Sequence, residues 1–475
     1  MKIAFIVSEA VPFAKTGGLA DVAAALPAAL AEAGNDVVIL LPFYREIREK
    51  FPGLSRRLGP GTGMPAVYEY RGFPVPVWFL EHDGWFGRRH LYCTASGDDP
   101  DNGDRFAWFC RLALASLQRI GFRSDIVHLH DWQTALAAAY LKFVLDRESY
   151  FAGTKAVFTI HNLAYQGLFD PGILDRAGLP EPLFQMEDLE FFGRVSFLKA
   201  GILYADAITT VSPRYAREIQ TPEFGCGLDG LLQARSSVLR GIVNGIDTAA
   251  WDPEKDPALV APFGPENMAG KALCKRDMLR SFGFVKTADD PPVISMVSRL
   301  AGQKGLDLLV EAVEDLVSLG LRIIIVGEGE AHIERGLQAA RSRFPGKIGL
   351  RIGFDDRLAR KVFAGSDFIL IPSRYEPCGL TQMYGQRYGT IPIVRAVGGL
   401  DDTVEEYRLE TGEGTGFKFA EATPRALVAA VRRALNACRN PETRLAIRRK
   451  GMARDFSWKR SAEAYLGLYH GLRGG

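Results

Sequence analysis

The chain opens with three contiguous segments, IAFIV (residues 3–7), SEAVPFAKTGG (8–18) and LADVAAALPAALAEA (19–33). The first segment is apolar without alternation, as expected for a parallel strand that is buried on both faces. The second is a turn with a glycine pair. The third has the pattern of a helix that ends before Gly34, where a helix C-cap favours glycine. This order predicts the start of a Rossmann-like α/β domain.

Strand and helix patterns then alternate along the chain in two series. The first series continues with strand-like segments at residues 37–41, 75–80, 126–129, 157–160 and 207–211. The second has them at residues 293–297, 323–326, 349–352, 368–371 and 391–394. Two series imply two α/β domains, and 475 residues are too many for one hydrophobic core. We predict an N-terminal domain over residues 1–242, a C-terminal domain over 243–456 and a final helix in 457–475.

The composition is that of a globular enzyme, with 47% hydrophobic and 24% charged residues. A net charge of +2 gives no reason to expect a nucleic-acid or acidic-membrane partner. No apolar run is long enough to span a bilayer, and the N-terminal run is too short for a signal peptide. The six cysteines are scattered without a C-x-x-C pair, so reduced thiols in a cytoplasmic protein are expected. The oligomeric state stays open.

Cations and glycines follow two of the predicted strands. Lys15 precedes the Gly17-Gly18 pair, where free amides at a helix start favour an anion. Arg299 and Lys304 follow the strand at 293–297, at the end where open α/β sheets bind ligands. Two cations there can neutralise a diphosphate leaving group without a metal. A plain turn and a solvated loop are the alternatives; the G-x-G-x-x-G and P-loop spacings are missing.

The segment PSRYEPCGLTQ (residues 372–382) follows another predicted strand and precedes a helix. Gly379, Leu380 and Thr381 would offer amides and a hydroxyl group to a phosphate at the helix start. Glu376 repels phosphate, so it is better suited to sugar hydroxyls or to a developing cationic sugar carbon. The alternative for Glu376 is a helix-capping carboxylate.

Two features resemble metal sites but do not predict one. The loop DDPDNGD (residues 98–104) lacks the terminal Glu of a calcium loop. His128 and His130 come at the end of one apolar strand and His161 at the end of another. No third partner stands at the sequence spacing of a metal site. Neutral hydrogen-bonding roles are expected for these histidines.

Seven words of sequence together resemble the bacterial glycogen synthase and plant starch synthase family over essentially the whole chain. They are KTGGLADV (15–22), HDW (130–132), HNLAYQG (161–167), VNGID (243–247), SRL with QKG (298–300 and 303–305), EPCGLTQ (376–382) and GGL (398–400). Several long words in the right order are far more specific than any one glycine motif.

The resemblance implies an α/β GT-B fold, in which two Rossmann-like domains face a central cleft and a C-terminal helix returns to the N-terminal domain. It implies retaining transfer of glucose from ADP-glucose to the non-reducing end of an α-1,4-glucan such as glycogen, with no cofactor and no metal. The alternatives are another GT-B transferase with a different donor or a small acceptor, and an inactive glucan-binding protein. The intact set of Lys15, Arg299, Lys304 and Glu376 argues against the inactive protein.

The resemblance also assigns roles to individual residues. The expected catalytic residues are Glu376, His161, Arg299 and Lys304. The expected donor-binding residues are Lys15, Gly17, Gly18, Asn244, Lys275, Phe354, Cys378, Gly379, Leu380 and Thr381, with the Phe354 ring on the adenine. Asp21, Asp131 and Asn162 are expected near the sugars. Many GT-B enzymes carry a second Glu eight residues after the first, where this chain has Tyr384, a feature that starch and glycogen synthases share.

Overall fold

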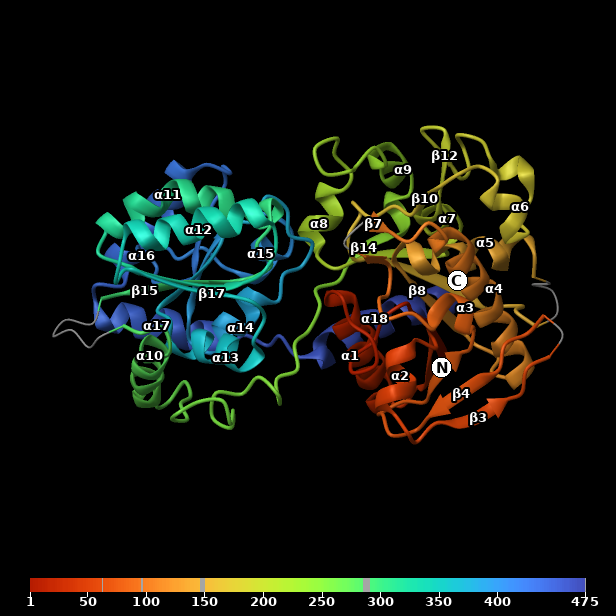
Figure 1. The fold of residues 1–475 in the computed structure, drawn as a ribbon, viewed down its shortest axis with the longest axis horizontal. Coiled ribbons are helices and arrows are strands. Elements are labelled where there is room, and N and C mark those ends of the chain that lie inside the picture. Colours follow the sequence, from red (N-terminus) through yellow and green to blue (C-terminus); the bar gives the residue numbers. More distant parts are fainter. Residues whose placement is uncertain (62, 95–96, 146–149, 285–290, 475) are drawn as a thin grey trace. The chain divides into compact units, whose positions relative to one another are not determined.

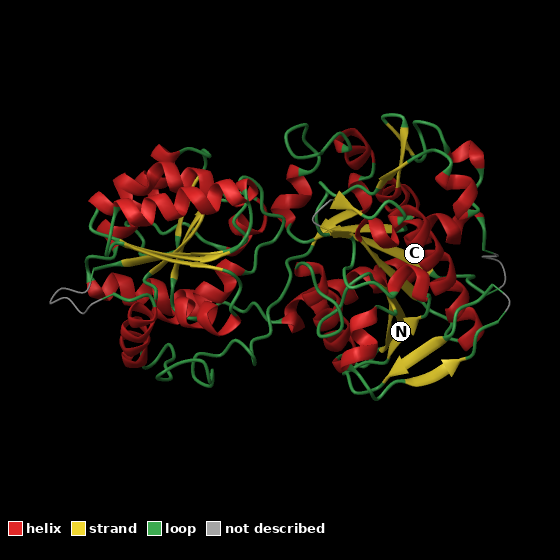
Figure 2. Cartoon of the chain, viewed as in Figure 1, coloured by secondary structure: helices red, strands yellow, loops and turns green. Residues whose placement is uncertain are grey.

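The computed structural model describes residues 1–61, 63–94, 97–145, 150–284 and 291–474. Internal contacts divide the chain into two compact units. The N-terminal unit comprises Met1–Val211, Ala216–Gly245 and Trp458–Gly475, and the C-terminal unit comprises Ser212–Tyr215 and Ile246–Ser457. Each unit is built around a sheet with helices against it (Figures 1 and 2).

The main sheet of the N-terminal unit has the strand order β14-β13-β9-β8-β1-β2-β5-β4-β3. Seven parallel strands come first and the antiparallel β4 and β3 form one edge. The strands are β1 (Lys2–Ile6), β2 (Asp36–Pro42), β3 (Ser55–Leu58), β4 (Val67–Tyr70), β5 (Val77–Leu80), β8 (Ile126–His130), β9 (Lys155–Ile160), β13 (Ala207–Thr210) and β14 (Leu239–Gly241). Residues 3–6 of β1 are fully buried, as the unbroken apolar run predicts.

Helices pack against this sheet and against one another. The longer ones are α1 (Gly18–Glu32), α4 (Asn102–Ile120), α5 (Asp131–Phe143), α7 (Phe197–Tyr204) and α18 (Trp458–Arg473). The short elements are α2 (Arg45–Lys50), α3 (Asp83–Phe86), β6 (Cys93–Thr94), β7 (Gly97–Asp98), β10 (Leu168–Phe169), α6 (Ile173–Ala177), η1 (Glu181–Leu183), β11 (Glu190–Phe191), β12 (Arg194–Ser196), α9 (Asp229–Ala234) and η2 (Ser236–Val238). Helix α8 (Pro213–Glu218) begins in the C-terminal unit and ends in the N-terminal unit. β10, β12 and β11 form a small antiparallel sheet of their own.

The C-terminal helix α18 belongs to the N-terminal unit, which confirms the return that the resemblance implied. It packs on α1, and the Tyr469 hydroxyl lies 2.7 Å from Nδ1 of His128. The Ser461 hydroxyl donates to the Val243 carbonyl at 2.7 Å. Gly245 also stays with this unit, because it lies so close to Trp458 that a Cβ atom would come within 2.7 Å of its backbone. The division therefore falls between Gly245 and Ile246, slightly after the predicted residue 243.

The C-terminal unit contains a parallel sheet with the strand order β17-β16-β15-β18-β19-β20. The strands are β15 (Val293–Val297), β16 (Arg322–Gly327), β17 (Ile348–Ile352), β18 (Phe368–Ile371), β19 (Ile391–Arg395) and β20 (Phe417–Phe419). The helices are α10 (Ala269–Ser281), η3 (Gly302–Lys304), α11 (Leu306–Ser318), α12 (Ala331–Arg343), α13 (Asp356–Gly365), α14 (Thr381–Arg387), α15 (Gly398–Thr403), α16 (Pro424–Ala437) and α17 (Pro441–Met452).

Helices cover both faces of this sheet (Figure 2). The side chains of β16 alternate between two hydrophobic clusters, one on each face. On β16, Ile323 and Ile325 pack with α11, α12 and α16, whereas Ile324 and Val326 pack with α10 and α13. This burial on two faces explains the apolar runs without alternation.

Both sheets reverse their strand order beside the first strand of their series. In the N-terminal unit β1 lies between β2 and β8, and in the C-terminal unit β15 lies between β16 and β18. At such a switch point the loops diverge and leave a crevice at the carboxyl ends of the strands, which is where open α/β sheets bind ligands. The topology thus selects the ends of β1 with β8 and of β15 with β18 as candidate sites.

Candidate active site

A pocket opens at the carboxyl ends of β15 and β18. Its wall is formed by Met296, Val297, Ser298, Lys304, Leu370, Ile371, Ser373, Glu376, Gly379, Leu380, Thr381 and Gln382. Five of the residues expected from the sequence, Lys304, Glu376, Gly379, Leu380 and Thr381, therefore line one cavity.

The central contact of this pocket is an ion pair between Lys304 and Glu376. The Lys304 Nζ atom lies 2.9 Å and 2.6 Å from the two carboxylate oxygens, and the Ser373 hydroxyl donates to the same carboxylate at 2.8 Å. Gly305 makes the contact possible, because its φ of 70° and its close approach to the Pro372 carbonyl leave no room for a Cβ atom. Sequence reasoning did not select Ser373, although it stands at a strand end like the others.

Three further expected residues of the C-terminal unit, Arg299, Phe354 and Cys378, do not line this pocket. Arg299 is exposed at the end of β15, and its guanidinium group donates to Gln303 Oε1 at 3.3 Å. Cys378 is buried, and its carbonyl accepts a hydrogen bond from Gln382. Phe354 follows β17 and is 77% exposed, which is the geometry of a ring available for stacking. Tyr384, at the position of the missing second Glu, stacks on Trp251 with ring centroids 3.9 Å apart.

Lys275 lies away from the pocket, contrary to the expectation that it binds the donor. Its Nζ atom lies 2.8 Å from Asp367 and 2.9 Å from the Pro291 carbonyl. These partners precede β18 and β15, so Lys275 stands at the amino edge of the sheet, opposite the pocket. Arg448 adds a second ion pair to Asp367 at 2.7 Å. Burial raises the pKa of Asp367, but the charges of Lys275 and Arg448 outweigh it and lower that pKa to about 2.

The N-terminal unit presents a second cluster, at the carboxyl end of β1. Lys15 forms an exposed ion pair with Asp21, with Nζ to carboxylate distances of 2.8 and 2.9 Å. Gly17 and Gly18 begin α1, and a Cβ atom at either would meet nothing within 4 Å. A ligand therefore has room to approach the backbone closely at both glycines.

The amide of Gly17 is not free for a ligand, which corrects the expectation for the glycine pair. The Glu9 carboxylate, buried at the end of β1, accepts from Gly17 N at 3.2 Å. It also accepts from the backbone amide of Thr16 and, at 2.6 Å, from the Thr16 hydroxyl. Sequence reasoning missed Glu9, even though it is the first carboxylate after a buried strand.

Tyr92 connects Glu9 to the Asp-rich loop. The Tyr92 hydroxyl lies 2.8 Å from both Ser8 Oγ and Glu9 Oε1, and the Tyr92 carbonyl accepts from Asn102. Burial, and after it the charge of Glu9, raise the pKa of Tyr92 well above its usual value, so the hydroxyl keeps its proton and donates.

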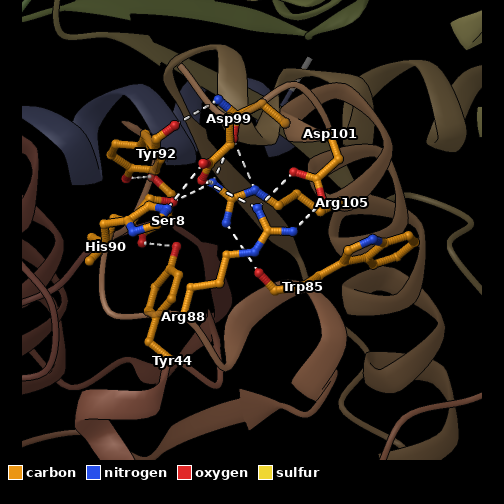
Figure 3. Close-up of polar contacts among 11 residues, drawn as sticks. Ser8, Tyr44, Trp85, Arg88, His90, Tyr92, Asp99, Asp101 and Arg105 are labelled. Atoms are coloured by element: carbon orange, nitrogen blue, oxygen red, sulfur yellow. Dashed lines mark hydrogen bonds and ion pairs between the residues drawn. The ribbon is translucent and has the colours of Figure 1, made fainter. Parts of the chain in front are cut away.

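The Asp-rich loop itself is held by arginines rather than arranged around a cation (Figure 3). Arg105 is fully buried, donates to Asn102 Oδ1 at 2.9 Å and lies 3.4 Å from the carboxylate of Asp99. Arg88 pairs with Asp99 and Asp101, and His90 lies 3.0 Å from Asp99. Within the described ranges, no group of three or more His, Cys, Asp or Glu residues is placed to hold a metal ion.

His161, Asn162 and Asp131 meet at the ends of β8 and β9. The buried Asp131 carboxylate accepts from the backbone amides of His161 at 2.7 Å and Asn162 at 3.4 Å. Burial raises the pKa of Asp131 to about 7, although these two amides act in the opposite direction. Burial lowers the pKa of His161 to about 3, so its ring is neutral, and its Nε2 lies 3.0 Å from His130 Nδ1. Asn244, in the same unit, is buried, and its Oδ1 has no hydrogen-bond partner among the described residues.

The chain is similar to known glycosyltransferases over almost its whole length. The family model described as "Starch synthase catalytic domain" matches residues 2–234, and "Glycosyl transferases group 1" matches residues 280–453. A glycogen synthase of Anaeromyxobacter dehalogenans (strain 2CP-C) is 48% identical over 99% of this chain and 100% of its own length. A glycogen synthase of Myxococcus xanthus (strain DK1622) is 48% identical over 99% of both chains. The chain belongs to the glycogen synthase family.

Solved structures agree with membership of the glycogen synthase family. The catalytic domain of starch synthase IV from Arabidopsis thaliana, bound to ADP and acarbose, superposes with a TM-score of 0.89 at 32% identity, covering 100% of this chain and 99% of that one. A sucrose-phosphate synthase from Thermosynechococcus elongatus shares the fold, with a TM-score of 0.61 at 19% identity over 99% of both chains. The chain is thus a glycosyltransferase with the GT-B fold. Among the described residues, no helix is long and apolar enough to cross a membrane.

We expect Lys275→Met to destabilise the C-terminal unit, since it leaves a buried carboxylate with one cation instead of two. The melting temperature should fall at pH 7. Because the pKa of folded Asp367 is depressed, the stability from its ion pairs is present above the ordinary aspartate pKa and is lost as the pH falls toward 2. The difference between variant and parent should therefore shrink below about pH 4. An equal difference at every pH would contradict this role.

We expect Glu9→Gln to loosen the loop at residues 15–18, because a neutral amide oxygen accepts from the Thr16 and Gly17 amides more weakly than a carboxylate does. A hydrogen bond to a charged group contributes about 1.5–3 kcal/mol, against about 0.5–1.5 kcal/mol for a neutral one. Hydrogen exchange of the amides at 15–18 should accelerate, while that of the central strand β1 stays slow. Tyr92→Phe removes only one donor to Glu9 and serves as the milder control. Unchanged exchange at 15–18 in Glu9→Gln would show that Glu9 does not hold the loop.

Proposed function

We propose that this chain is a glycogen synthase, which transfers glucose from ADP-glucose to the non-reducing end of an α-1,4-glucan with retention at the anomeric carbon. The observation that carries the proposal is the Lys304–Glu376 ion pair in a switch-point pocket, in a chain 48% identical over its whole length to glycogen synthases. A cation and a carboxylate in one pocket suit a donor that has an anionic diphosphate next to a neutral sugar.

In this proposal Lys304 and Arg299 bind the diphosphate of the donor. The ammonium group of Lys304 already faces the pocket, and the exposed guanidinium group of Arg299 stands at the end of β15, the same strand that Lys304 follows. The backbone of Gly379, Leu380 and Thr381 would complete the phosphate site at the start of α14. These groups stabilise the charge that develops on ADP as it leaves, an effect of several kcal/mol when the groups are held in place beforehand. No metal is needed for that neutralisation.

Glu376 is the carboxylate we assign to the donor sugar. Held by Lys304 and Ser373, it has a fixed position beside the phosphate site. From there it can accept hydrogen bonds from sugar hydroxyls and stabilise positive charge on the anomeric carbon. The position of the second Glu of many GT-B enzymes is filled by Tyr384, which stacks on Trp251, so this position offers no carboxylate for a covalent glucosyl intermediate. We propose attack of the acceptor hydroxyl from the same face that ADP leaves.

Residues of the N-terminal unit are proposed to act on the same donor and on the acceptor. Lys15 would add a cation for the phosphates, next to the open backbone at Gly17 and Gly18. The neutral His161 and its neighbour Asn162, oriented by Asp131, would contact the reacting sugar. Asp21 would bind sugar hydroxyls once the Lys15 side chain leaves it to contact the donor phosphates. We also propose that Asn244 and Cys378 shape the donor site, that Phe354 packs on the adenine, and that the enzyme works in the cytoplasm.

The proposal predicts how the rate of glucose transfer depends on the donor and on the residues of the pocket. Glucose incorporation into glycogen should be fast with ADP-glucose and slow with UDP- and GDP-glucose. Glu376→Gln and Lys304→Met should each lower kcat by about 10²–10³-fold, as removal of one transition-state contact does elsewhere. Glu413→Gln and Lys255→Met change the same residue types at exposed positions and should leave kcat unaltered. Near-normal incorporation by Glu376→Gln, or a preference for another donor, would overturn the proposal.

A further inference from the structure

Phe192 occupies a position that disfavours an aromatic residue both by its backbone conformation and by its exposure to solvent. Pairing of Glu190 with Val195 and of Phe191 with Arg194 leaves Phe192 and Gly193 as a two-residue hairpin turn. Both have positive φ, 49° and 76°, which is the turn geometry that prefers Asn-Gly. The Phe192 side chain is also 84% exposed. A bulky residue held at positive φ is strained, and such strain is concentrated at ligand-binding positions, so Phe192 points to a function outside folding.

The hairpin that presents Phe192 is firmly held. The buried ammonium group of Lys199 donates to the carbonyls of Met186 at 2.7 Å and Glu190 at 2.8 Å. The amide of Gly193 donates to the Glu190 side chain at 2.7 Å. The Phe192 ring meets the Phe191 ring edge to face, with centroids 4.7 Å apart. The exposed ring is therefore a fixed platform, which loses little conformational entropy when a ligand binds.

The platform belongs to the same group of loops as His161 and Asn162. Strand β12 of the hairpin pairs with β10, which directly follows the segment 161–167. Gly227 lies against the hairpin, because a Cβ atom there would come within 3.1 Å of Phe191 and 3.5 Å of Phe192. The neighbouring Cys226 carbonyl accepts a hydrogen bond from Gln166 Nε2 at 2.9 Å. In Figure 2 the small sheet stands apart from the main sheet of its unit.

We propose that Phe192 binds the glucan acceptor, by stacking on a glucose unit beyond the reacting end. A pyranose ring has apolar C–H faces and polar hydroxyl edges, so it suits a flat exposed ring that projects from a polar hairpin. A glucan is neutral and needs no cation at this place. One ring on a hairpin tip is far smaller than the roughly 800 Å² per partner that a stable protein interface buries. The inference rests on the proposed glucan acceptor.

Phe192→Asn tests the platform without endangering the fold, because Asn adopts positive φ readily and is polar. The melting temperature should be equal to or above that of the parent. The KM for glycogen and for maltoheptaose should rise about five- to tenfold, as expected for a lost aromatic contact, with a smaller rise for maltotriose. Phe192→Tyr keeps the ring and should keep the KM. Leu409→Asn removes another exposed apolar side chain, in the C-terminal unit, and should change neither value.

A binding measurement separates this inference from the proposed reaction. In gel electrophoresis through glycogen without donor, the parent and Phe192→Tyr should be retarded more than Phe192→Asn. Equal retardation and equal KM for parent and Phe192→Asn would overturn the platform. If the parent transferred no glucose from ADP-glucose, the proposed function would fail, while loss of retardation in Phe192→Asn would still support the platform.

Discussion

The structure of the candidate site depends on how a cation and a carboxylate are kept together at the end of a parallel sheet. Burying either charge alone is costly, and their pairing in good geometry offsets that cost. Lys304 and Glu376 are 72 residues apart in sequence, and they meet because the strand order reverses between β15 and β18. Gly305 permits the close approach of the two loops. The pair delivers an ammonium group and an oriented carboxylate to one pocket, and a diphosphate competes with Glu376 for the ammonium group.

The N-terminal unit applies the same principle with different partners. Asp21 holds Lys15, and Glu9 holds the amides of Thr16 and Gly17, so the ammonium group and two backbone amides of the loop have carboxylate partners. Glu9 in turn is fixed by Tyr92, and the Asp-rich loop holds Tyr92 through Asn102. A loop that carries a lysine and two glycines thereby gains a defined conformation. The N-terminal unit differs from the C-terminal unit in that it presents a neutral histidine, His161, together with acidic residues. These groups suit sugars better than phosphates.

The sequence predicted the features that periodicity and strand ends encode. The strand at 293–297 has the predicted bounds, and the rule that ligands bind at the carboxyl ends of strands selected Lys304, Glu376 and His161. It did not reveal the edge strands β3 and β4, because Ser55–Leu58 is short, exposed and charged. Lys275 was misplaced because a family motif on a helix does not show which edge of the sheet the side chain reaches. The partners of Glu9 depend on the path of the turn, which residue types alone do not specify.

The central claim is that Lys304 serves the diphosphate and is held for that task by Glu376. Calorimetric titration with ADP tests it most directly, because ADP carries the diphosphate without the sugar. Lys304→Met should weaken ADP binding by about 10- to 100-fold, the equivalent of a lost charge-assisted hydrogen bond. Glu376→Gln should bind ADP as tightly as the parent or more tightly, since the competing carboxylate is gone. Equal weakening of ADP binding in both variants would contradict the account.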